Sequence, residues 1–234
     1  YYYVLLLETI MKLSENTLNV LKNFAAINQG LVVKPGKTLR TISTNKAILA
    51  EAAVDETFPN EFGVYDLNKV LSVVDKNSPE VEFEKESLVF QSVGKIRIRY
   101  TPTNLILAPP NKNINIPAYD VKFNLTSEVL SWVFSMASVL KCPNIVIKSD
   151  GGKGGEINIW AMDVAGHIVD DATVKVDGTS DIAFNAVMKV ENLKILAGAY
   201  EVQIAAAGVA LFKHTTKNVT YWIAIEQASS NFQK

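Results

Sequence analysis

Cysteine and histidine are scarce in this chain of 234 residues, which has one cysteine, Cys142, and two histidines, His167 and His214. A single cysteine excludes an internal disulfide and is typical of a protein kept in a reducing compartment. Neither histidine has a Cys or a second His at ligand spacing, so we expect no metal site. The apolar stretch at residues 1–10, "YYYVLLLETI", is shorter than the ~20 residues that cross a bilayer, so no membrane partner is expected.

Excess charge of either sign is also absent, because 23 basic and 24 acidic residues leave a net charge of −1. No global positive field points to nucleic acid, so any such binding must come from a local arrangement of charge. Glycine and proline are few, at 12 and 8 residues, and apolar residues make up 48% of the chain. This composition is typical of a globular protein with one large domain or two of ordinary size.

Residues 1–10 stand apart from the rest of the sequence. They lack the basic leading region and the small-residue cleavage site of a signal peptide. The first methionine is Met11. We therefore interpret residues 1–10 as an upstream extension or an artefact and expect the fold to begin at Met11.

Two segments about half a chain apart repeat one pattern: "LSENTLNVLKNFA" at residues 13–25 and "LTSEVLSWVFSMA" at residues 125–137. "IVIK" in the second half matches "LVVK" in the first, and "YEVQI" matches "PEVEF". Each half is expected to order its elements as helix, strands, short helix and strands. The sequence therefore predicts a duplicated α+β unit, with domains at 11–105 and 122–234 and a proline-rich connector at 106–121.

Local signals predict four helices. Ser14 is expected to cap a helix that Gly30 closes as a C′ glycine, and Asp66 is expected to cap a short second helix. A third helix is expected from Thr126, its N-cap, to about Lys141. A fourth is expected within "FNAVMKVENLKILAG" at residues 184–198, where apolar residues recur at spacing three.

No catalytic set is visible. "GLVVKPGKT" resembles a phosphate-binding loop, but its first glycine stands one place too early and no helix follows it. A nucleotide-dependent enzyme using Gly36, Lys37 and Thr38 is therefore the least favoured alternative. The loop "DGGKGG" at residues 150–155 is expected to be a hairpin turn between strands.

The expected helices present polar residues opposite their apolar stripes. These are Lys12, Asn16, Asn19, Lys22 and Asn23 on the first, Lys69, Ser72 and Lys76 on the second, Ser131, Ser135 and Ser138 on the third, and Lys189 and Asn192 on the fourth. One interpretation is ordinary solvated faces. The other is a surface that touches phosphates without reading bases, since lysine contacts give sequence-independent attraction.

Four segments, "LKNFAAINQGL", "VYDLNKVL", "LAPPNKNINIPA" and "YWIAIE", together resemble the sliding clamp of T-even-type bacteriophages, the polymerase processivity factor. The resemblance implies an α+β DNA-clamp fold with two domains, each having two helices packed on antiparallel sheets. It also implies a homotrimeric ring, closed head to tail, with the helices around duplex DNA. Such a protein needs no cofactor and is not an enzyme, because a separate clamp-loader ATPase opens the ring in the cytoplasm of the infected bacterial host.

The resemblance also implies functional residues and partners. The DNA-facing set would be Lys12, Asn16, Asn19, Lys22, Asn23, Lys69, Lys76, Ser131, Ser135, Lys189 and Asn192. Serines occupy the third helix, where more positive charge is expected. The polymerase, the loader and late-transcription factors would dock apolar tails on the outer surface. For that docking site we expect the connector and the last strand, namely Leu107, Pro109, Pro110, Ile114, Ile116, Tyr221 and Ile223, whose alternative role is plain core packing.

Head-to-tail closure requires one interface with two different sides, and we expect strand edges at the two ends of the subunit to pair across it. The main alternative function is a duplicated β-rich structural or interaction protein of a phage that does not encircle DNA.

Overall fold

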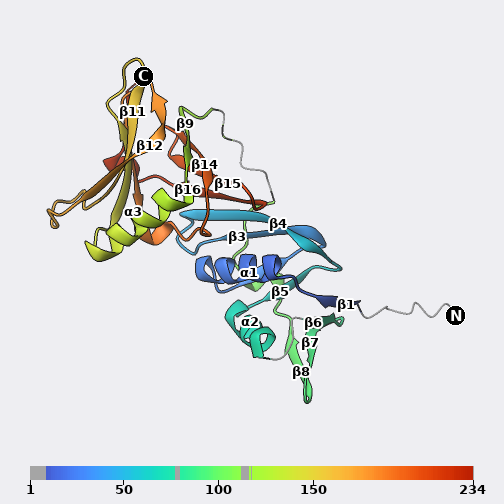
Figure 1. Cartoon of the computed structure of the whole chain (residues 1–234). Coiled ribbons are helices and arrows are strands. Elements are labelled where there is room, and N and C mark those ends of the chain that lie inside the picture. The colour runs from blue at the N-terminus through green and yellow to red at the C-terminus, as the bar shows by residue number, and fades with distance from the viewer. Residues whose placement is uncertain (1–8, 77–79, 112–115, 117, 234) are drawn as a thin grey trace. The chain divides into compact units, whose positions relative to one another are not determined.

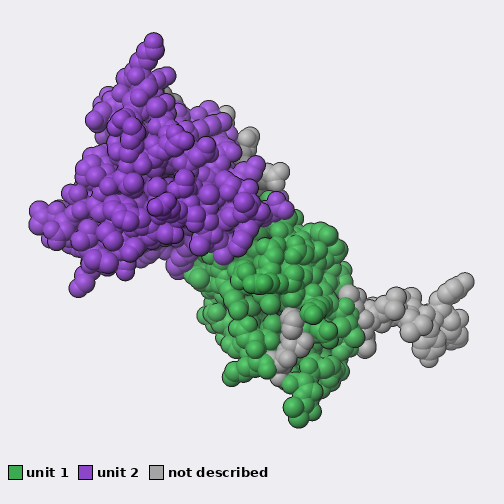
Figure 2. Space-filling view, viewed as in Figure 1, with its two compact units in different colours: residues 1–44, 51–109 green, residues 45–50, 110–234 purple. Residues whose placement is uncertain are grey.

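The computed structural model describes residues 9–76, 80–111, 116 and 118–233. The chain divides into two compact units (Figure 2). Unit 1 comprises residues 1–44 and 51–109, and unit 2 comprises residues 45–50 and 110–234. None of the helices in the described part of the chain has the length and apolar character needed to cross a membrane.

In its described residues, unit 1 contains two α-helices and several antiparallel strands (Figure 1). One sheet has the order β1-β6-β7-β8, and β2 pairs separately with β5. The elements are β1 Thr9–Lys12, α1 Glu15–Ile27, β2 Leu31–Val33, β3 Gly36–Ile42, β4 Ile48–Phe58, β5 Phe62–Val64, α2 Leu67–Lys76, β6 Glu80–Phe83, β7 Ser87–Gln91, β8 Lys95–Arg99 and the 3₁₀ turn η1 Thr103–Leu105. Strand β4 begins in unit 2 and continues in unit 1.

The described part of unit 2 contains one α-helix and a run of antiparallel strands in the order β17-β13-β10-β11-β12-β9-β14-β15-β16, with the beginning of β4 beside β16. The elements are β9 Val121–Leu125, α3 Ser127–Val139, β10 Asn144–Ser149, β11 Gly155–Met162, β12 Ala172–Ser180, β13 Phe184–Lys189, η2 Val190–Asn192, β14 Tyr200–Ala205, β15 Val209–His214, β16 Val219–Ala224, η3 Gln227–Ser229 and β17 Asn231–Phe232.

The predicted duplication is confirmed by the strand pairings. The pairs β1–β6 and β2–β5 of the first copy recur as β9–β14 and β10–β13, and the meander β6-β7-β8 recurs as β14-β15-β16. Even the register recurs, because Met11 lies opposite Val81 and Phe123 lies opposite Val202, each two residues before the matched leucine of its copy. Both copies therefore fold by one plan.

The three predicted N-caps are confirmed. Side-chain oxygens of Ser14, Asp66 and Thr126 each accept the backbone N–H three residues ahead, at 3.1, 3.1 and 3.2 Å. The predicted C′ glycine is wrong. The backbone turns extended at Asn28, where φ is −147°, and the Asn28 side chain accepts the N–H of Gly30 at 3.0 Å. The chain thus leaves the helix in an extended conformation at Asn28, and no left-handed glycine ends the helix.

The predicted fourth helix is also wrong, because residues 184–189 form strand β13 and only Val190–Asn192 turn as a 3₁₀ helix. Strand β13 pairs with β10 on one side and with β17 on the other. Val187 and Met188, neighbours in sequence, are both fully buried. A strand covered on both faces reads as a continuous apolar run, which periodicity does not distinguish from a buried helix.

The boundaries of the units differ from the predicted ones. Thr9 and Ile10, assigned to the extension, belong to β1 and lie opposite Phe83 and Glu82. Unit 1 continues to Pro109, and residues 45–50 join unit 2. These features depend on contacts between distant residues, which no local signal carries.

Each unit has its own apolar core. In unit 1 the rings of Phe58, Phe62 and Phe83 pack with centroids 5.6–6.2 Å apart, an arrangement that adds ~0.5–1.5 kcal/mol per pair beyond burial. In unit 2, Tyr200 contacts Phe212 in an edge-on arrangement, with ring centroids 6.0 Å apart. These cores hold the helices and strands that carry the candidate surfaces.

Candidate nucleic-acid interface and partner surface

Helix α2 is amphipathic in the way the sequence predicts. Its apolar stripe, which runs from Leu67 to Val74, is buried in unit 1. Lys69, Ser72 and Lys76 are exposed on the opposite side. The helix therefore presents two ammonium groups and a hydroxyl to solvent.

Helix α1 lies beside α2 (Figure 1) and shares an ion pair with it. Lys22 Nζ lies 3.0 Å from Asp75 Oδ1 of α2, and both side chains are about half exposed. Asn16, Asn19 and Asn23 are half-buried on α1. The polar face of α1 is thus rich in amides, while its one exposed lysine is partly neutralised.

Lys12, expected to belong to the first helix, lies on strand β1 and is exposed. Asn16 of the helix donates a long hydrogen bond of 3.4 Å to Asp55 of β4. Among the described residues, Lys12, Lys69 and Lys76 make no ion pair. These three amines are consequently the ones in the predicted set that are free to meet phosphate.

Helix α3 presents hydroxyls where cations are expected. Ser131 and Ser135 are exposed, and the helix carries no lysine or arginine between its bounds. The same helix exposes two large apolar side chains, Trp132 and Val139, at 40% and 68%. Trp132 and Val139 are seven residues apart, about two helical turns, so they lie on the same side of α3.

Lys189 and Asn192 do not share a helix face, because the helix does not form. Lys189 is exposed at the end of β13, with Nζ 3.7 Å from Glu226 Oε1. Asn192 is buried, and its Oδ1 accepts a hydrogen bond from Asn45 Nδ2 at 3.1 Å, within unit 2. Asn192 is therefore a structural residue, and its predicted place on a DNA-facing surface is wrong.

The last strand does not form the predicted partner surface. Tyr221 and Ile223 are fully buried in unit 2. The Tyr221 hydroxyl accepts the N–H of Leu196 at 3.2 Å, and the Tyr200 hydroxyl donates to the carbonyl of Leu196 at 2.5 Å. Burial raises the pKa of both tyrosines above the ordinary range, so their hydroxyls stay neutral. Buried and half-buried residues alternate along β16, and Tyr221 and Ile223 both fall on its buried side.

The connector does supply apolar surface. Leu107 and Pro110 are exposed, Pro109 and Ile116 are half-buried, and Ile114 lies outside the described residues. The carbonyl of Leu107 accepts a hydrogen bond from Asn28 Nδ2 at 3.2 Å, which attaches the start of the connector to the end of α1.

A hollow of about 270 Å³ adjoins this attachment point in unit 1. Its walls are the last turn of α1, Thr44, Tyr65 and residues 105–107. The side chains of Tyr65 and Leu105 are two-thirds exposed at its rim. Neither residue belongs to the predicted partner surface, although an aromatic residue just before the Asp66 cap and off the apolar stripe is a signal for Tyr65.

Gly63 of β5 pairs with Thr101, in the segment just before the connector. The N–H of Thr101 donates to the Gly63 carbonyl at 2.9 Å, and a Cβ at Gly63 would lie 2.3 Å from the Thr101 carbonyl oxygen. Only a residue without a side chain permits this approach.

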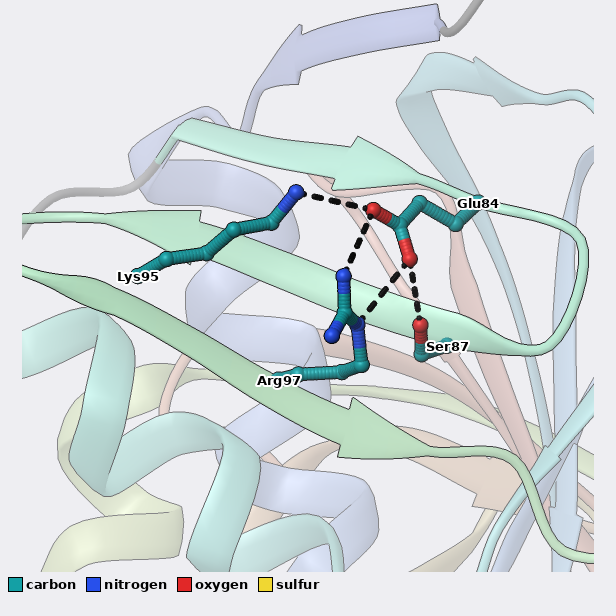
Figure 3. Close-up of polar contacts among 4 residues, drawn as sticks. All are labelled: Glu84, Ser87, Lys95 and Arg97. Carbon is teal, nitrogen blue, oxygen red and sulfur yellow. Dashed lines mark hydrogen bonds and ion pairs between the residues drawn. The ribbon is translucent and has the colours of Figure 1, made fainter.

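An ion cluster covers the outer face of the sheet that ends in β8 (Figure 3). Glu84 accepts hydrogen bonds from Arg97 at 3.1 and 3.2 Å, from Lys95 at 3.0 Å and from Ser87 at 2.9 Å. The Arg97 guanidinium and then the Lys95 ammonium lower the pKa of Glu84 from 4.5 to about 2. Arg99, on the same face of β8, has no ion pair among the described residues.

Gly36, Lys37 and Thr38 lie at the beginning of strand β3. A strand in place of a helix leaves no N-terminal amides to receive phosphate, so these residues give no support to a nucleotide site.

A chain with two copies of one α+β module, polar helix faces and an open strand edge has the architecture of a DNA clamp. Solved structures agree on the fold. The Proliferating Cellular Nuclear Antigen of Entamoeba histolytica matches with a TM-score of 0.66 and 11% identity, covering 94% of this chain and 98% of that one. A. fulgidus PCNA, solved with the C-terminal region of FEN-1 bound, matches with a TM-score of 0.67 and 13% identity over the same shares.

Sequence relatives narrow the class. The profile of the DNA polymerase processivity factor family matches residues 12–88. The sliding clamp of Vibrio phage KVP40 is 30% identical over 223 residues, covering 92% of this chain and 99% of that protein. The sliding clamps of Escherichia phage RB69 and Enterobacteria phage T4 are 28% and 25% identical, each over 94% of this chain and 99% of the relative. The chain belongs to the sliding clamp family of phage DNA polymerase processivity factors, as its resemblance to the T-even-type clamps predicts.

Proposed function

We propose that three copies of this chain close head to tail into a ring around duplex DNA and hold the replicative polymerase on its template. The duplicated strand plan carries this proposal. Within unit 2, the N–H of Ala224 in β16 donates to the carbonyl of Ala47, just before β4, at 2.8 Å. Strand β16, the last strand of the second meander, thus lies beside β4. In the first copy, β4 is the third of the four strands between α1 and α2.

The counterparts of these two strands in the repeat are β8 and β12. Strand β8 is terminal in its sheet, and β12 pairs along its length with β11 but with β9 only at Asp177. Each chain therefore contains one junction, between β16 and β4. Its β8 and β12 are the two strands that a second junction of the same kind would need. A pairing of β8 with β12 of the next copy gives a heterologous interface that can close a ring and that covers two strand edges.

Inside the ring, the polar faces of α1, α2 and α3 face the duplex. Lys12, Lys69 and Lys76 are the principal cations, with weaker contributions from Lys22 and Lys189, which already have carboxylate partners. Asn16, Asn19, Asn23, Ser131 and Ser135 supply short neutral groups. Contacts screened within ~8 Å at physiological salt attract the duplex without fixing the ring at one place.

Partner tails dock outside the ring on the apolar surface of unit 1 formed by Tyr65, Leu105, Leu107 and Pro109. The polymerase, a clamp-loader ATPase and late-transcription factors would share this surface in the infected bacterial host. A polymerase held there rebinds its template at high local concentration, so the clamp acts by tethering and performs no chemistry itself.

The test is retention on nicked circular DNA after loading by the cognate ATPase. A ring stays on the circle and is lost when the circle is cut, because only topology holds it. Retention that survives linearisation contradicts encirclement and indicates ordinary binding. Polymerase stimulation separates the main alternative, since a β-rich structural protein would not stimulate a polymerase even if it assembled.

A further inference from the structure

A hollow of about 790 Å³ opens beside the end of α3 in unit 2. Its walls are the last turn of α3 with residues 141–144, the turn at residues 163–167 that follows β11, the end of β13 with η2, and the segment that follows β16. Among the surfaces proposed above, only that of the DNA-facing cations shares a wall residue with the hollow, namely Lys189. The hollow is therefore a feature that tethering on DNA does not explain.

Strand pairing shows which part of unit 1 corresponds to this hollow. The matched segments "LVVK" and "IVIK" begin at Leu31 and Ile145, which lie opposite Val64 of β5 and Met188 of β13. The two copies therefore align residue by residue along these strands. The end of α1 with the start of the connector corresponds to the end of α3 with the segment that follows β16.

One residue before these positions, the first copy has Gly30 and Gly63, and the second has Asn144 and Val187. A main-chain hydrogen bond agrees with this correspondence. The segment after β8 donates an N–H to the Gly63 carbonyl at 2.9 Å, and the segment after β16 donates one to the Val187 carbonyl at 2.8 Å. Because Asn144 and Val187 both line the hollow, it lies at the place that the two glycines mark in unit 1.

In the first copy, the connector itself covers this place. A Cβ on Gly30 would lie 3.0 Å from Cγ2 of Ile106, and a Cβ on Gly63 would lie 2.7 Å from Cδ1 of Ile106. The Ile106 side chain is 9% exposed, and Asn28 Nδ2 donates to the carbonyl of Leu107 at 3.2 Å. A branched apolar side chain and the carbonyl of the following residue thus hold an extended segment against the end of the helix.

In the second copy, the corresponding segment is bound elsewhere. Phe232 of β17 lies opposite Phe184 of β13, and the two rings stack with centroids 5.9 Å apart. The N–H of Gln233 donates to the carbonyl of Ala183 at 2.9 Å. Since these contacts hold the segment along β13, it leaves the hollow beside α3 open.

Asn144 supplies the hollow with a hydrogen-bond donor. Its side chain is 7% exposed and lines the hollow at the start of β10. Its Oδ1 accepts the N–H of Val164 at 3.2 Å, whereas its Nδ2 has no hydrogen-bond partner among the residues that the structure describes. A buried amide nitrogen without an acceptor is costly, and the carbonyl of a bound peptide would satisfy it. Asn144 can therefore hold a segment in the way that Asn28 holds the connector.

Apolar side chains form another part of the wall. Pro143 is exposed, Val164 is 40% exposed, and Val190 is half-buried. These three groups offer contact to an apolar side chain, as the end of α1 and β5 do to Ile106.

The charges around the hollow cancel. The Asp163 carboxylate accepts three main-chain N–H groups of the turn that follows it, at 2.9–3.1 Å. Lys189 lies 3.7 Å from Glu226. Lys141 and Glu191 make no ion pair within the described part of the chain and leave one charge of each sign. The wall thus matches an uncharged segment better than an acidic or a basic one.

We infer that this hollow is a second docking site, which binds an extended, uncharged segment of a partner protein. A branched apolar side chain of that segment contacts the apolar wall, and Asn144 binds the carbonyl of the following residue. The site is separate from the partner surface of unit 1 and does not depend on ring closure. One chain then holds two partners, or two segments of one partner, at the same time.

The test uses a fluorescent peptide with the sequence of residues 103–109, "TNLILAP", and measures its anisotropy with the whole chain. The peptide carries the side chain and the carbonyl that the connector uses in unit 1. We expect binding with a dissociation constant below ~1 mM. Asn144→Asp keeps an acceptor for the N–H of Val164 and removes the donor, so it should weaken binding about tenfold.

Two further variants locate the peptide and control for the change of charge. Val164→Asp, on the exposed turn, should also weaken binding, and it serves as the test if Asn144→Asp does not fold by circular dichroism. Asn218→Asp makes the same chemical change in the exposed turn between β15 and β16, outside the walls of the hollow, and should bind the peptide as wild type does.

Absence of binding to wild type at ~1 mM, or equal binding by wild type, folded Asn144→Asp and Val164→Asp, overturns the inference. Loss of binding in Tyr65→Ser with full binding in Asn144→Asp would place the peptide in unit 1 and also overturn it. A chain that binds the peptide but is not retained on circular DNA contradicts the proposed ring and leaves the docking site intact. The two failures are thus distinct.

Discussion

Asn28 joins three parts of unit 1, and its removal should loosen them together. Its Nδ2 donates to the carbonyls of Ile42 at 3.0 Å and of Leu107 at 3.2 Å, and its Oδ1 accepts the N–H of Gly30 at 3.0 Å. The side chain is buried at the end of α1. Asn28→Ala therefore removes three hydrogen bonds and deprives the start of the connector of its attachment.

The expected loss follows from those bonds. A typical intramolecular hydrogen bond contributes ~1 kcal/mol net, and buried groups left without a partner cost more. We expect Asn28→Ala to lower the free energy of unfolding of unit 1 by about 3 kcal/mol. Asn28→Asp should cost at least as much, because a carboxylate oxygen would then face two carbonyl oxygens.

Urea unfolding followed by circular dichroism, at one protein concentration for all variants, measures this loss. The three tryptophans, Trp132, Trp160 and Trp222, lie in unit 2, so their fluorescence would not report on unit 1. Hydrogen exchange of residues 101–109 should accelerate in both Asn28 variants. Asn19→Ala, on the half-buried polar side of α1, is the control and should change stability by less than ~0.5 kcal/mol. A loss below ~1 kcal/mol with unchanged exchange would refute the reasoning.

Three further predictions concern charge and capping. The extra free energy of unfolding of wild type over Glu84→Gln should have its full value above pH 4.5 and vanish as pH falls towards 2. The reason is that the folded-state pKa of Glu84 is lowered from 4.5 to about 2. Acid unfolding curves of the two proteins that stay apart below pH 2 would contradict this. Asp75→Asn, which frees Lys22, should strengthen DNA association at low salt, and Lys69→Glu should weaken it. The slope of the logarithm of the association constant against the logarithm of the salt concentration should change by ~0.9 per phosphate contact. Equal slopes in both variants would show that α2 does not contact DNA. Thr126→Ala should cost ~1 kcal/mol in thermal unfolding through loss of the α3 cap, and Thr126→Ser should restore it.

Features set by local chemistry could be predicted from the sequence. Ser14, Asp66 and Thr126 cap their helices because a side-chain oxygen needs only the N–H three residues ahead. The polar and apolar sides of α2 follow from spacing along one helix. The duplication could be predicted because both copies keep the same spacing of apolar residues after the matched leucines, Leu13 and Leu125.

Features set by distant partners could not be predicted. Residues 184–189 form a strand because β10 and β17 flank them, although their apolar spacing also suits a helix. In the sequence alone, Tyr221 and Ile223 are compatible with an apolar docking surface, and only the pairing of β16 with β15 shows that they belong to the core. The burial of Asn192 depends on Asn45, which is far away in sequence.

The divergence of the two copies determines how the proposed ring would hold DNA. Helix α2 gives the first copy two free amines, Lys69 and Lys76, whereas the second copy has the short turn η2 at that point and serines along α3. Around a ring of three chains, cationic sectors would therefore alternate with neutral hydroxyl sectors. A duplex inside such a ring is attracted at any one time by a few lysines and slides past surfaces that make only weak contacts. Replacing Ser131 and Ser135 by lysine should consequently slow diffusion along DNA more than it improves loading, which single-molecule tracking of the loaded ring can measure.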